Sequence, residues 1–251
     1  MQDTEALRKL PGEGISAQLA SYFRGTRLVP VEIRFEATEQ AGKVSALLMR
    51  PEKADWLLVL GHGAGAGMRH SFMEAISERL ANYGVATFRY QFPYMEQRGR
   101  RPDPPPILLA TVRSAVAAAA EAVGDLPILA GGKSMGGRMT SMSAAKVPLA
   151  CVRGLVFFGF PLHPAGRPAI ERAEHLSKVT VPMLFLQGTR DKLAELELLR
   201  PVCTRLAERA TLHVVDGADH SFHVLARSGS TAREVIDKLG QTVADWASRL
   251  G

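Results

Sequence analysis

The sequence predicts one α/β domain built on a single, mostly parallel β-sheet of about eight strands. Three observations predict it: the chain length, an alternating segment near the start, and a later series in which apolar strands and helix-length segments take turns. The chain has 251 residues, of which 46% are hydrophobic, and this is enough to bury a substantial core. No repeat or linker divides it, so we expect a single domain over residues 1–251, with residues 1–30 as an N-terminal arm.

The first part of the predicted sheet is an antiparallel hairpin. Residues 31–36 alternate strictly between apolar and polar side chains, and residues 44–49 follow after a turn that contains Gly42. Alternation with a period of two is typical of a strand with one solvated face. The hairpin therefore forms one edge of the predicted sheet.

Downstream, short apolar strands are separated by helix-length segments. Fully apolar strands that alternate with helices indicate a parallel sheet with helices on both faces. The predicted strands are residues 56–60, 85–90, 127–130, 155–158, 183–186 and 211–215, and the predicted helices are residues 72–83, 107–123, 135–146, 194–209 and 233–250.

Composition excludes several classes of function. The net charge is +6, but the basic residues are scattered except in the loop at residues 98–101, so we expect no nucleic-acid partner. Residues 107–123 form the longest apolar stretch and include charged residues, so we expect no membrane span. The seven histidines are dispersed without ligand spacing, so neither a metal nor another cofactor is expected. Two cysteines and an N-terminus without an apolar core favour the cytoplasm.

A Gly-x-Ser-x-Gly motif is centred on Ser134, between an apolar strand and a helix. The turn is so tight that the residues two before and two after the serine must be small, and Gly132 and Gly136 meet this need. The hydroxyl then lies at a helix N-terminus, where free N–H groups stabilise negative charge. Ser134 is therefore the candidate nucleophile. A phosphate loop ending in Gly-Lys-Ser is excluded, because it requires glycine where Pro127 stands.

Two further polar residues follow apolar strands. Asp191 comes after the strand at residues 183–186, and His220 comes after the strand at residues 211–215. The carboxyl ends of parallel strands meet at one edge of a sheet, so both should lie beside Ser134. His220 is the candidate base that takes the serine proton, and Asp191 is the candidate acid that orients it.

The Gly-His-Gly-Ala loop at residues 61–64 has two interpretations. It either supplies an oxyanion donor or begins a dinucleotide-binding Gly-x-Gly-x-x-Ala motif. A dinucleotide site also needs an acidic residue at the end of the next strand, and residues 85–91 contain none. We therefore favour the oxyanion interpretation, in which His62 is a structural hydrogen-bonding residue of the loop.

On these motifs, the sequence resembles the α/β-hydrolase superfamily, specifically the dienelactone-hydrolase-like branch of serine esterases and acyl-peptidases. The resemblance runs from about residue 31 to the C-terminus and implies an α/β-hydrolase fold, with an oxyanion hole formed by the N–H groups of Ala64 and Met135. Dienelactone hydrolases use cysteine where this chain has Ser134, so their substrate is not carried over. The segment at residues 160–180 is short, so we expect a minimal lid.

The expected activity is cleavage of a small-molecule ester, thioester or amide through an acyl-enzyme intermediate, by a monomer or homodimer. The alternatives are a catalytically silent interaction protein on the same fold and a dinucleotide-binding protein. Residues beside the motif loops are expected to contact the substrate: His62, Gly63, Met68, Met95, Phe160 and Phe222.

Overall fold

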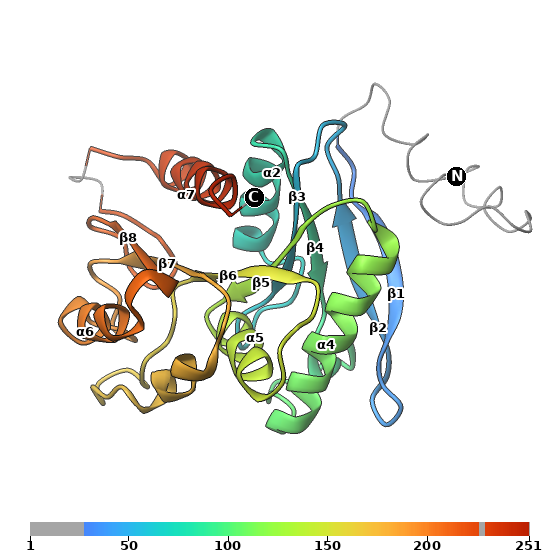
Figure 1. Cartoon of the computed structure of the whole chain (residues 1–251), viewed down its shortest axis with the longest axis horizontal. Helices are drawn as coiled ribbons and strands as arrows, with labels where there is room; N and C mark the ends of the chain where they lie inside the picture. Colours follow the sequence, from blue (N-terminus) through green and yellow to red (C-terminus); the bar gives the residue numbers. More distant parts are fainter. Residues whose placement is uncertain (1–27, 226–228, 251) are drawn as a thin grey trace, which may run out of the picture.

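The computed structural model describes residues 28–225 and 229–250, so most of the predicted N-terminal arm lies outside the described residues. Within them, eight strands form one sheet in the order β1-β2-β4-β3-β5-β6-β7-β8 (Figure 1). The strand β2 pairs antiparallel with both β1 and β4, and all later neighbours pair parallel. The predicted mostly parallel sheet with an antiparallel N-terminal hairpin is confirmed.

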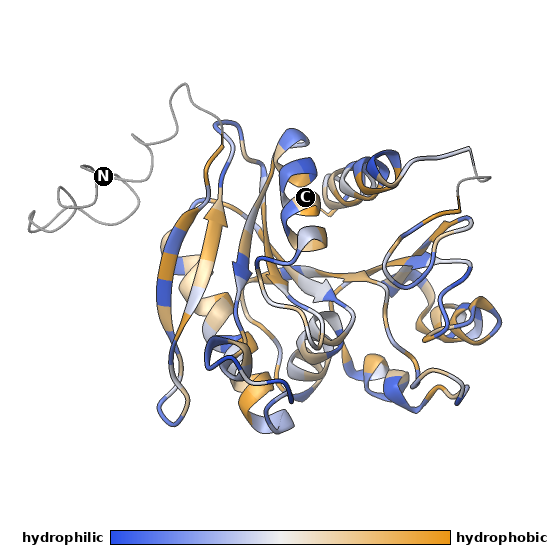
Figure 2. Ribbon diagram, turned by 180° about the vertical axis from the view of Figure 1, so that it is seen from behind, coloured by the Kyte–Doolittle hydropathy of each residue, from blue (hydrophilic) through white to orange (hydrophobic). Residues whose placement is uncertain are grey.

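The strands lie where the apolar pattern predicts them. They are β1 (Val31–Thr38), β2 (Gly42–Met49), β3 (Trp56–Gly61), β4 (Val85–Tyr90), β5 (Ile128–Lys133), β6 (Val152–Phe158), β7 (Met183–Gly188) and β8 (Ala210–Val215). Every residue of β3, β4 and β7 is buried, whereas exposed residues recur at every second position in the first part of β1. Figure 2 shows this alternation of hydrophilic and hydrophobic residues along the edge strand.

Helices cover both faces of the sheet. They are α2 (Ser71–Asn82), α4 (Pro105–Ala122), α5 (Met135–Lys146), α6 (Leu196–Leu206) and α7 (Ala232–Ala247). In β3, Leu57 and Val59 belong to the core under α4, α5 and α6, whereas Leu58 and Leu60 belong to the core under α2 and α7 (Figure 1). Successive side chains of a strand point to opposite faces, so a continuously apolar strand fills two cores at once.

Two short helices do not follow from the apolar pattern: α3 (Pro93–Glu96) and η2 (Glu171–Lys178). The predicted helix at residues 194–209 is divided into α6, which begins at Leu196, and the 3₁₀ helix η3 (Ala207–Arg209). The segment at residues 160–180 contains only the 3₁₀ helix η2, which packs against α5, so the expected minimal lid is confirmed. None of the described helices combines the length and the apolar character that crossing a bilayer requires.

Candidate active site

Ser134 occupies a strained turn between β5 and α5. Its φ is 50° and its ψ is −113°, a backbone conformation that residues with a Cβ rarely adopt. The Ser134 N–H donates to the carbonyl of Phe158 at 3.1 Å, which ties the turn to the neighbouring strand β6. The turn therefore presents the serine hydroxyl beyond the carboxyl end of the sheet.

The glycines on either side of Ser134 are required by packing. A Cβ at Gly132 would lie 2.3 Å from the carbonyl oxygen of Gly61, and a Cβ at Gly136 would lie 2.2 Å from the same oxygen. Both distances are shorter than any real contact of a Cβ atom. The first turn of α5 thus presses directly against the end of β3, which brings the loop at residues 61–64 next to Ser134.

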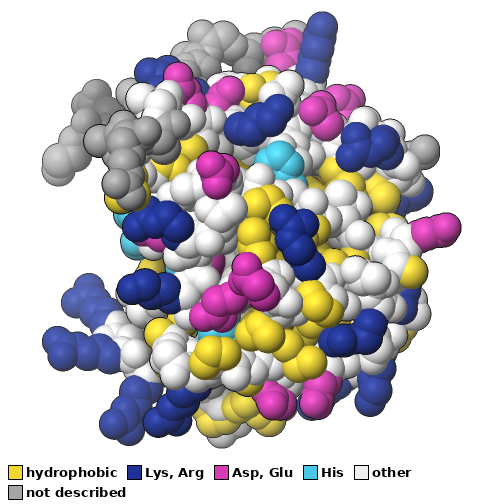
Figure 3. Space-filling model, turned by 90° about the vertical axis from the view of Figure 1, so that its left-hand side faces the viewer, with side chains coloured by type: hydrophobic (Ala, Val, Ile, Leu, Met, Phe, Trp, Pro, Cys, Tyr) yellow, Lys and Arg dark blue, Asp and Glu magenta, His cyan; other side chains and the backbone are white. Residues whose placement is uncertain are grey.

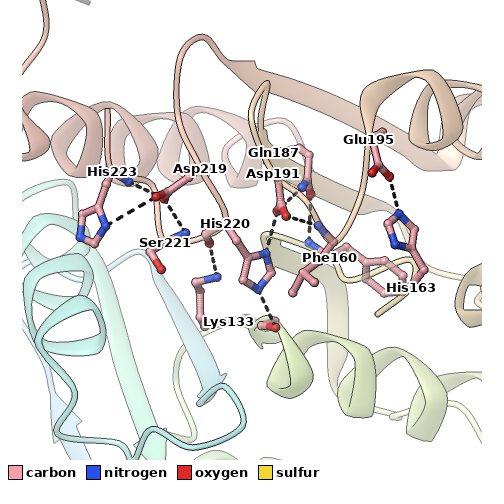
Figure 4. A network of polar contacts seen from close by, with 12 residues as sticks. Lys133, Phe160, His163, Gln187, Asp191, Glu195, Asp219, His220, Ser221 and His223 are labelled. Carbon is pink, nitrogen blue, oxygen red and sulfur yellow. Dashed lines mark hydrogen bonds and ion pairs between the residues drawn. The ribbon is translucent and has the colours of Figure 1, made fainter. Parts of the chain in front are cut away.

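A continuous hydrogen-bonded chain joins His220 to Ser134 and to Asp191. The His220 Nε2 lies 2.8 Å from the Ser134 Oγ, and the His220 Nδ1 lies 2.7 Å from the Asp191 Oδ2 (Figure 4). A carboxylate only accepts, so we assign the ring proton to Nδ1, which leaves Nε2 to accept the hydroxyl proton. This is the arrangement in which a serine hydroxyl can be activated for attack.

Asp191 is held by donors on several sides. Its side chain is buried, with a residue exposure of 3%, and it accepts hydrogen bonds from the Gln187 Nε2 at 2.5 Å and from the Leu193 N–H at 2.8 Å. The Gln187 Oε1 in turn accepts from the Phe160 N–H at 3.0 Å. With His220 as the third donor, these contacts offset the cost of burying a carboxylate and fix its direction.

The loop that carries His220 is braced by the neighbouring acid. The Asp219 Oδ1 accepts from the N–H groups of Ser221 at 2.8 Å and His223 at 2.9 Å (Figure 4). Phe222 has a φ of 63°, which turns the chain back sharply after His220. Asp219 therefore shapes the loop, while the ring of His220 pairs with the more distant Asp191.

The two expected oxyanion donors belong to the two segments that border Ser134. Met135 is the first residue of α5, where a helix leaves its N–H without an acceptor. Ala64 lines the same cavity as Ser134, and a Cβ at the preceding Gly63 would lie 3.8 Å from the Ser134 Cβ. The two N–H groups therefore belong to segments that both contact the serine.

His62 has a structural role. Its Nδ1 donates to the Gly63 carbonyl at 2.8 Å, and its Nε2 accepts from the Phe92 N–H at 3.1 Å. The side chain is fully buried, and this burial lowers the pKa of His62 to about 4. The expected hydrogen-bonding role in the loop fits this geometry. The expected substrate contact is corrected, because no surface of His62 is exposed to a ligand.

A cavity of about 720 Å³ opens beside Ser134 and extends between the N-terminal ends of α2 and α7. Of the expected contact residues, Gly63 and Phe222 line it, whereas Met68, Met95 and Phe160 do not. The full lining comprises Gly63, Ala64, Gly65, Ala66, His70, Ser71, Phe72, Met73, Ala75, Lys133, Ser134, Leu193, His220, Ser221, Phe222, His223, Ala232 and Ile236.

The expected substrate contacts of Phe160, Met68 and Met95 are corrected, because their side chains are buried or partly buried outside the cavity. Phe160 is 1% exposed and packs edge-on against Phe157 and Phe185 on the α5 and α6 side of the sheet. Met68 is buried, and Met95 packs against the same core as Phe160. The wall at Ile236 and the cavity face of Lys133 were not expected, because α7 carries no motif and Lys133 is a variable position of Gly-x-Ser-x-Gly.

Another cavity, of about 680 Å³, lies at the amino-terminal ends of β3, β5 and β6. Its lining includes Trp56, Asp125, Cys151 and Arg153, but neither a serine nor a histidine. In the described part of the chain, no group of three or more His, Cys, Asp or Glu side chains is placed to hold a metal ion. The pair of Ser134 and His220 therefore marks the cavity between α2 and α7 as the candidate active site.

Comparison with known proteins gives a family and a fold. Residues 54–248 match the family model described as "Alpha/beta hydrolase domain". Similar solved structures include the dienelactone hydrolase from Anabaena variabilis ATCC 29413, which is 19% identical with a TM-score of 0.71 and is matched over 89% of this chain and 99% of that chain. XC6422 from Xanthomonas campestris, described as an a/b serine hydrolase without lid, is 18% identical with a TM-score of 0.68, over 88% and 98% of the two chains. Est1E from Butyrivibrio proteoclasticus is 17% identical with a TM-score of 0.65, over 86% and 99%.

Proposed function

The chain belongs to the alpha/beta hydrolase family, and on this premise we propose that it is a serine hydrolase that cleaves carboxylic esters. One observation carries the proposal: the unbroken hydrogen-bonded chain from Asp191 through His220 to Ser134, with distances of 2.7 Å and 2.8 Å. The family supports hydrolase activity in general. We propose the triad from the hydrogen bonds of the site and the ester substrate from the chemistry that this triad can perform.

The proposed reaction begins with proton transfer from the Ser134 hydroxyl to the His220 Nε2. The serine oxygen attacks the ester carbonyl carbon, and the N–H groups of Met135 and Ala64 stabilise the resulting oxyanion. Asp191 stabilises the imidazolium, which then protonates the departing alkoxide and leaves an acyl-serine. Water repeats the sequence, with His220 as base, and releases the carboxylic acid and the free serine.

The cavity supports a small, largely apolar substrate. Phe72, Phe222 and Ile236 contribute apolar walls, and the volume of about 720 Å³ is within the range of small-molecule sites. A long acyl chain usually needs a lid that excludes water, and η2 is too short to provide one. We therefore propose short acyl esters, of about two to six carbons, as substrates.

Surface charge and cysteine chemistry bear on the remaining proposals. On the face shown in Figure 3, basic side chains are mixed with acidic and apolar ones over the centre and gather only towards one edge. This mixture supports a small-molecule substrate over a nucleic-acid partner.

Cys151 and Cys203 are free thiols, as expected in a reducing compartment, and we propose a cytoplasmic monomer or homodimer.

The proposal is tested by hydrolysis of nitrophenyl butyrate by the wild type and two serine variants. Ser134→Ala should lose at least about 10³-fold in kcat, because it removes the nucleophile. Ser177→Ala, at an exposed position on η2, is the matched control and should keep wild-type turnover. Undiminished turnover by Ser134→Ala, with circular dichroism like that of the wild type, would refute the proposal.

A further inference from the structure

Lys133 directly precedes the nucleophile, yet its side chain turns back beneath the loop of the base. Its Nζ donates a hydrogen bond of 2.5 Å to the main-chain carbonyl of His220 (Figure 4). Lys133 is the last residue of β5, so this contact joins the strand that presents Ser134 to the loop that presents His220. The two reacting side chains are thereby linked through a single residue.

The Lys133 ammonium is enclosed by aromatic rings as well. Its Nζ lies 5.8 Å from the ring centroid of Phe72 and 5.6 Å from that of Phe222, and the two rings stack at 5.7 Å with an interplanar angle of 17°. The aromatic contacts favour the cation. In the described part of the chain, no carboxylate forms an ion pair with Lys133, although the charges of Asp191 and Asp219 act on it. Burial lowers the pKa of Lys133 to about 8.

A glycine keeps the ammonium close to the imidazole ring. Gly159 has a φ of 70°, and a Cβ at this position would lie 3.2 Å from the Lys133 Nζ and 3.3 Å from the His220 Nδ1. Both atoms border the same small space, so the two groups are near neighbours. A side chain at residue 159 would push them apart.

We propose that Lys133 is a positioning residue for the base: it holds His220 in register with Ser134 through the main-chain carbonyl and places a cation beside the imidazole ring. This inference rests on the proposed function. The charged groups that face His220 are Asp191, from the loop after β7, and Lys133, from β5; Asp219 lies in the base's own loop.

The proposed role of Lys133 can be tested directly, because Lys133→Met keeps most of the side-chain volume and removes the charge and the hydrogen-bond donor. A base displaced by about 1 Å costs on the order of 10²-fold, so kcat for nitrophenyl butyrate should fall about 10-fold to 100-fold while KM changes less than about threefold. Removing a nearby cation should also displace the acid limb of the kcat/KM profile. Lys53→Met, at an exposed loop position, is the control and should change neither quantity.

A second pair of variants separates charge from packing. Lys133→Arg keeps the charge and should restore the wild-type acid limb, even where bulk lowers kcat. Lys133→Gln should shift the limb as Lys133→Met does, and it replaces that variant if circular dichroism shows the methionine protein unfolded. A proton NMR signal of the His220 Nδ1–H, identified by its loss in His220→Ala, should change position in both neutral variants without any substrate present.

The outcomes distinguish this inference from the proposed function. If hydrolysis does not depend on Ser134, the proposed function fails, and the NMR signal alone then decides whether Lys133 acts on His220. If hydrolysis depends on Ser134 but the folded neutral variants keep the wild-type kcat, acid limb and NMR signal, only the role of Lys133 is overturned.

Discussion

In the described part of the chain, two histidine rings are hydrogen-bonded to a carboxylate, and only one of the two also faces a candidate nucleophile. His220 pairs with Asp191 at 2.7 Å, and His163 pairs with Glu195 at 2.5 Å. The acids are four residues apart, on the segment between β7 and α6 (Figure 4). By distance to a carboxylate alone, the two histidines are equivalent candidates for a base.

The difference is at the other ring nitrogen. The His220 Nε2 faces the Ser134 hydroxyl, which can give up a proton, whereas the His163 Nδ1 lies 2.9 Å from the carbonyl of Pro164, which can only accept one. His163 is also fully buried, so no substrate reaches its ring. A candidate base is therefore distinguished from a structural histidine by the group opposite the carboxylate and by access to a cavity.

Removing each histidine is expected to produce the largest contrast. His220→Ala should lower kcat by about 10³-fold or more, because the serine proton has no acceptor. His163→Ala should change kcat less than about fivefold. It should instead lower thermal stability, because the Glu195 carboxylate loses this hydrogen-bond partner and the missing ring leaves a buried cavity. Nitrophenyl ester kinetics and thermal unfolding measure the two effects. Equal loss of turnover in both folded variants would contradict the assignment of His220, and not His163, as the base.

Neutralising the acids is expected to give a smaller contrast of the same sign. Asp191→Asn should lower kcat by about 10²-fold to 10⁴-fold, since an amide can hold the ring in the wrong tautomer. Glu195→Gln should keep turnover within about threefold of the wild type and cost about 0.5 to 1.5 kcal/mol of stability. Urea unfolding and kcat on one ester measure both. A Glu195→Gln defect as large as that of Asp191→Asn would show that the second pair takes part in catalysis.

A third histidine, His62, should make the stability of the protein depend on pH. Burial lowers the pKa of His62 to about 4, below the value of about 6.5 in an unfolded chain. The unfolded state therefore binds more protons between these values, so the stability due to neutral His62 is complete above about pH 6.5 and is lost, by about 3 kcal/mol at most, as the pH falls towards 4. Urea unfolding at pH 7 and pH 4.5 should show this slope, and His62→Gln should flatten it. An equal slope in both proteins would contradict the burial argument.

The smallest expected effect concerns the cavity that only the first pair borders. Ile236 lines its far wall, on α7. Ile236→Ala should extend the room for an acyl chain and shift the optimum of kcat/KM by about two carbons, at about 0.8 kcal/mol per methylene. Leu198→Ala, a partly buried position on α6 outside that cavity, is the control and should leave the optimum unchanged. A panel of nitrophenyl esters measures both, and an optimum at about twelve carbons in the wild type would contradict the proposed preference for short acyl esters.

The sheet and the polar residues beyond the carboxyl ends of its strands could be predicted, because each is marked by a local sequence pattern. Ser134, Asp191 and His220 each follow an apolar strand, and the parallel topology then brings the three together. The glycines around Ser134 are needed by contacts with β3, which is also a property of the motif.

The walls of the cavity and the second pair could not be predicted in this way. Phe160 directly follows β6, but its side chain packs against Phe157 and also against Phe185, which lies on the separate strand β7. Met68 is buried outside the cavity. The contacts from His163 to Glu195 and from Lys133 to His220 join residues 32 and 87 positions apart, and no local pattern marks either partner.

The hydrogen bonds from Asp191 through His220 to Ser134 are proposed to make this serine, and no other, the nucleophile. This proposal is tested most directly by mass spectrometry after labelling with a fluorophosphonate. We expect one label per chain on the Ser134 peptide in the wild type and in His163→Ala, and no label in Ser134→Ala or, over the same time, in His220→Ala. A label on another residue, or labelling of His220→Ala at the wild-type rate, would contradict the proposal.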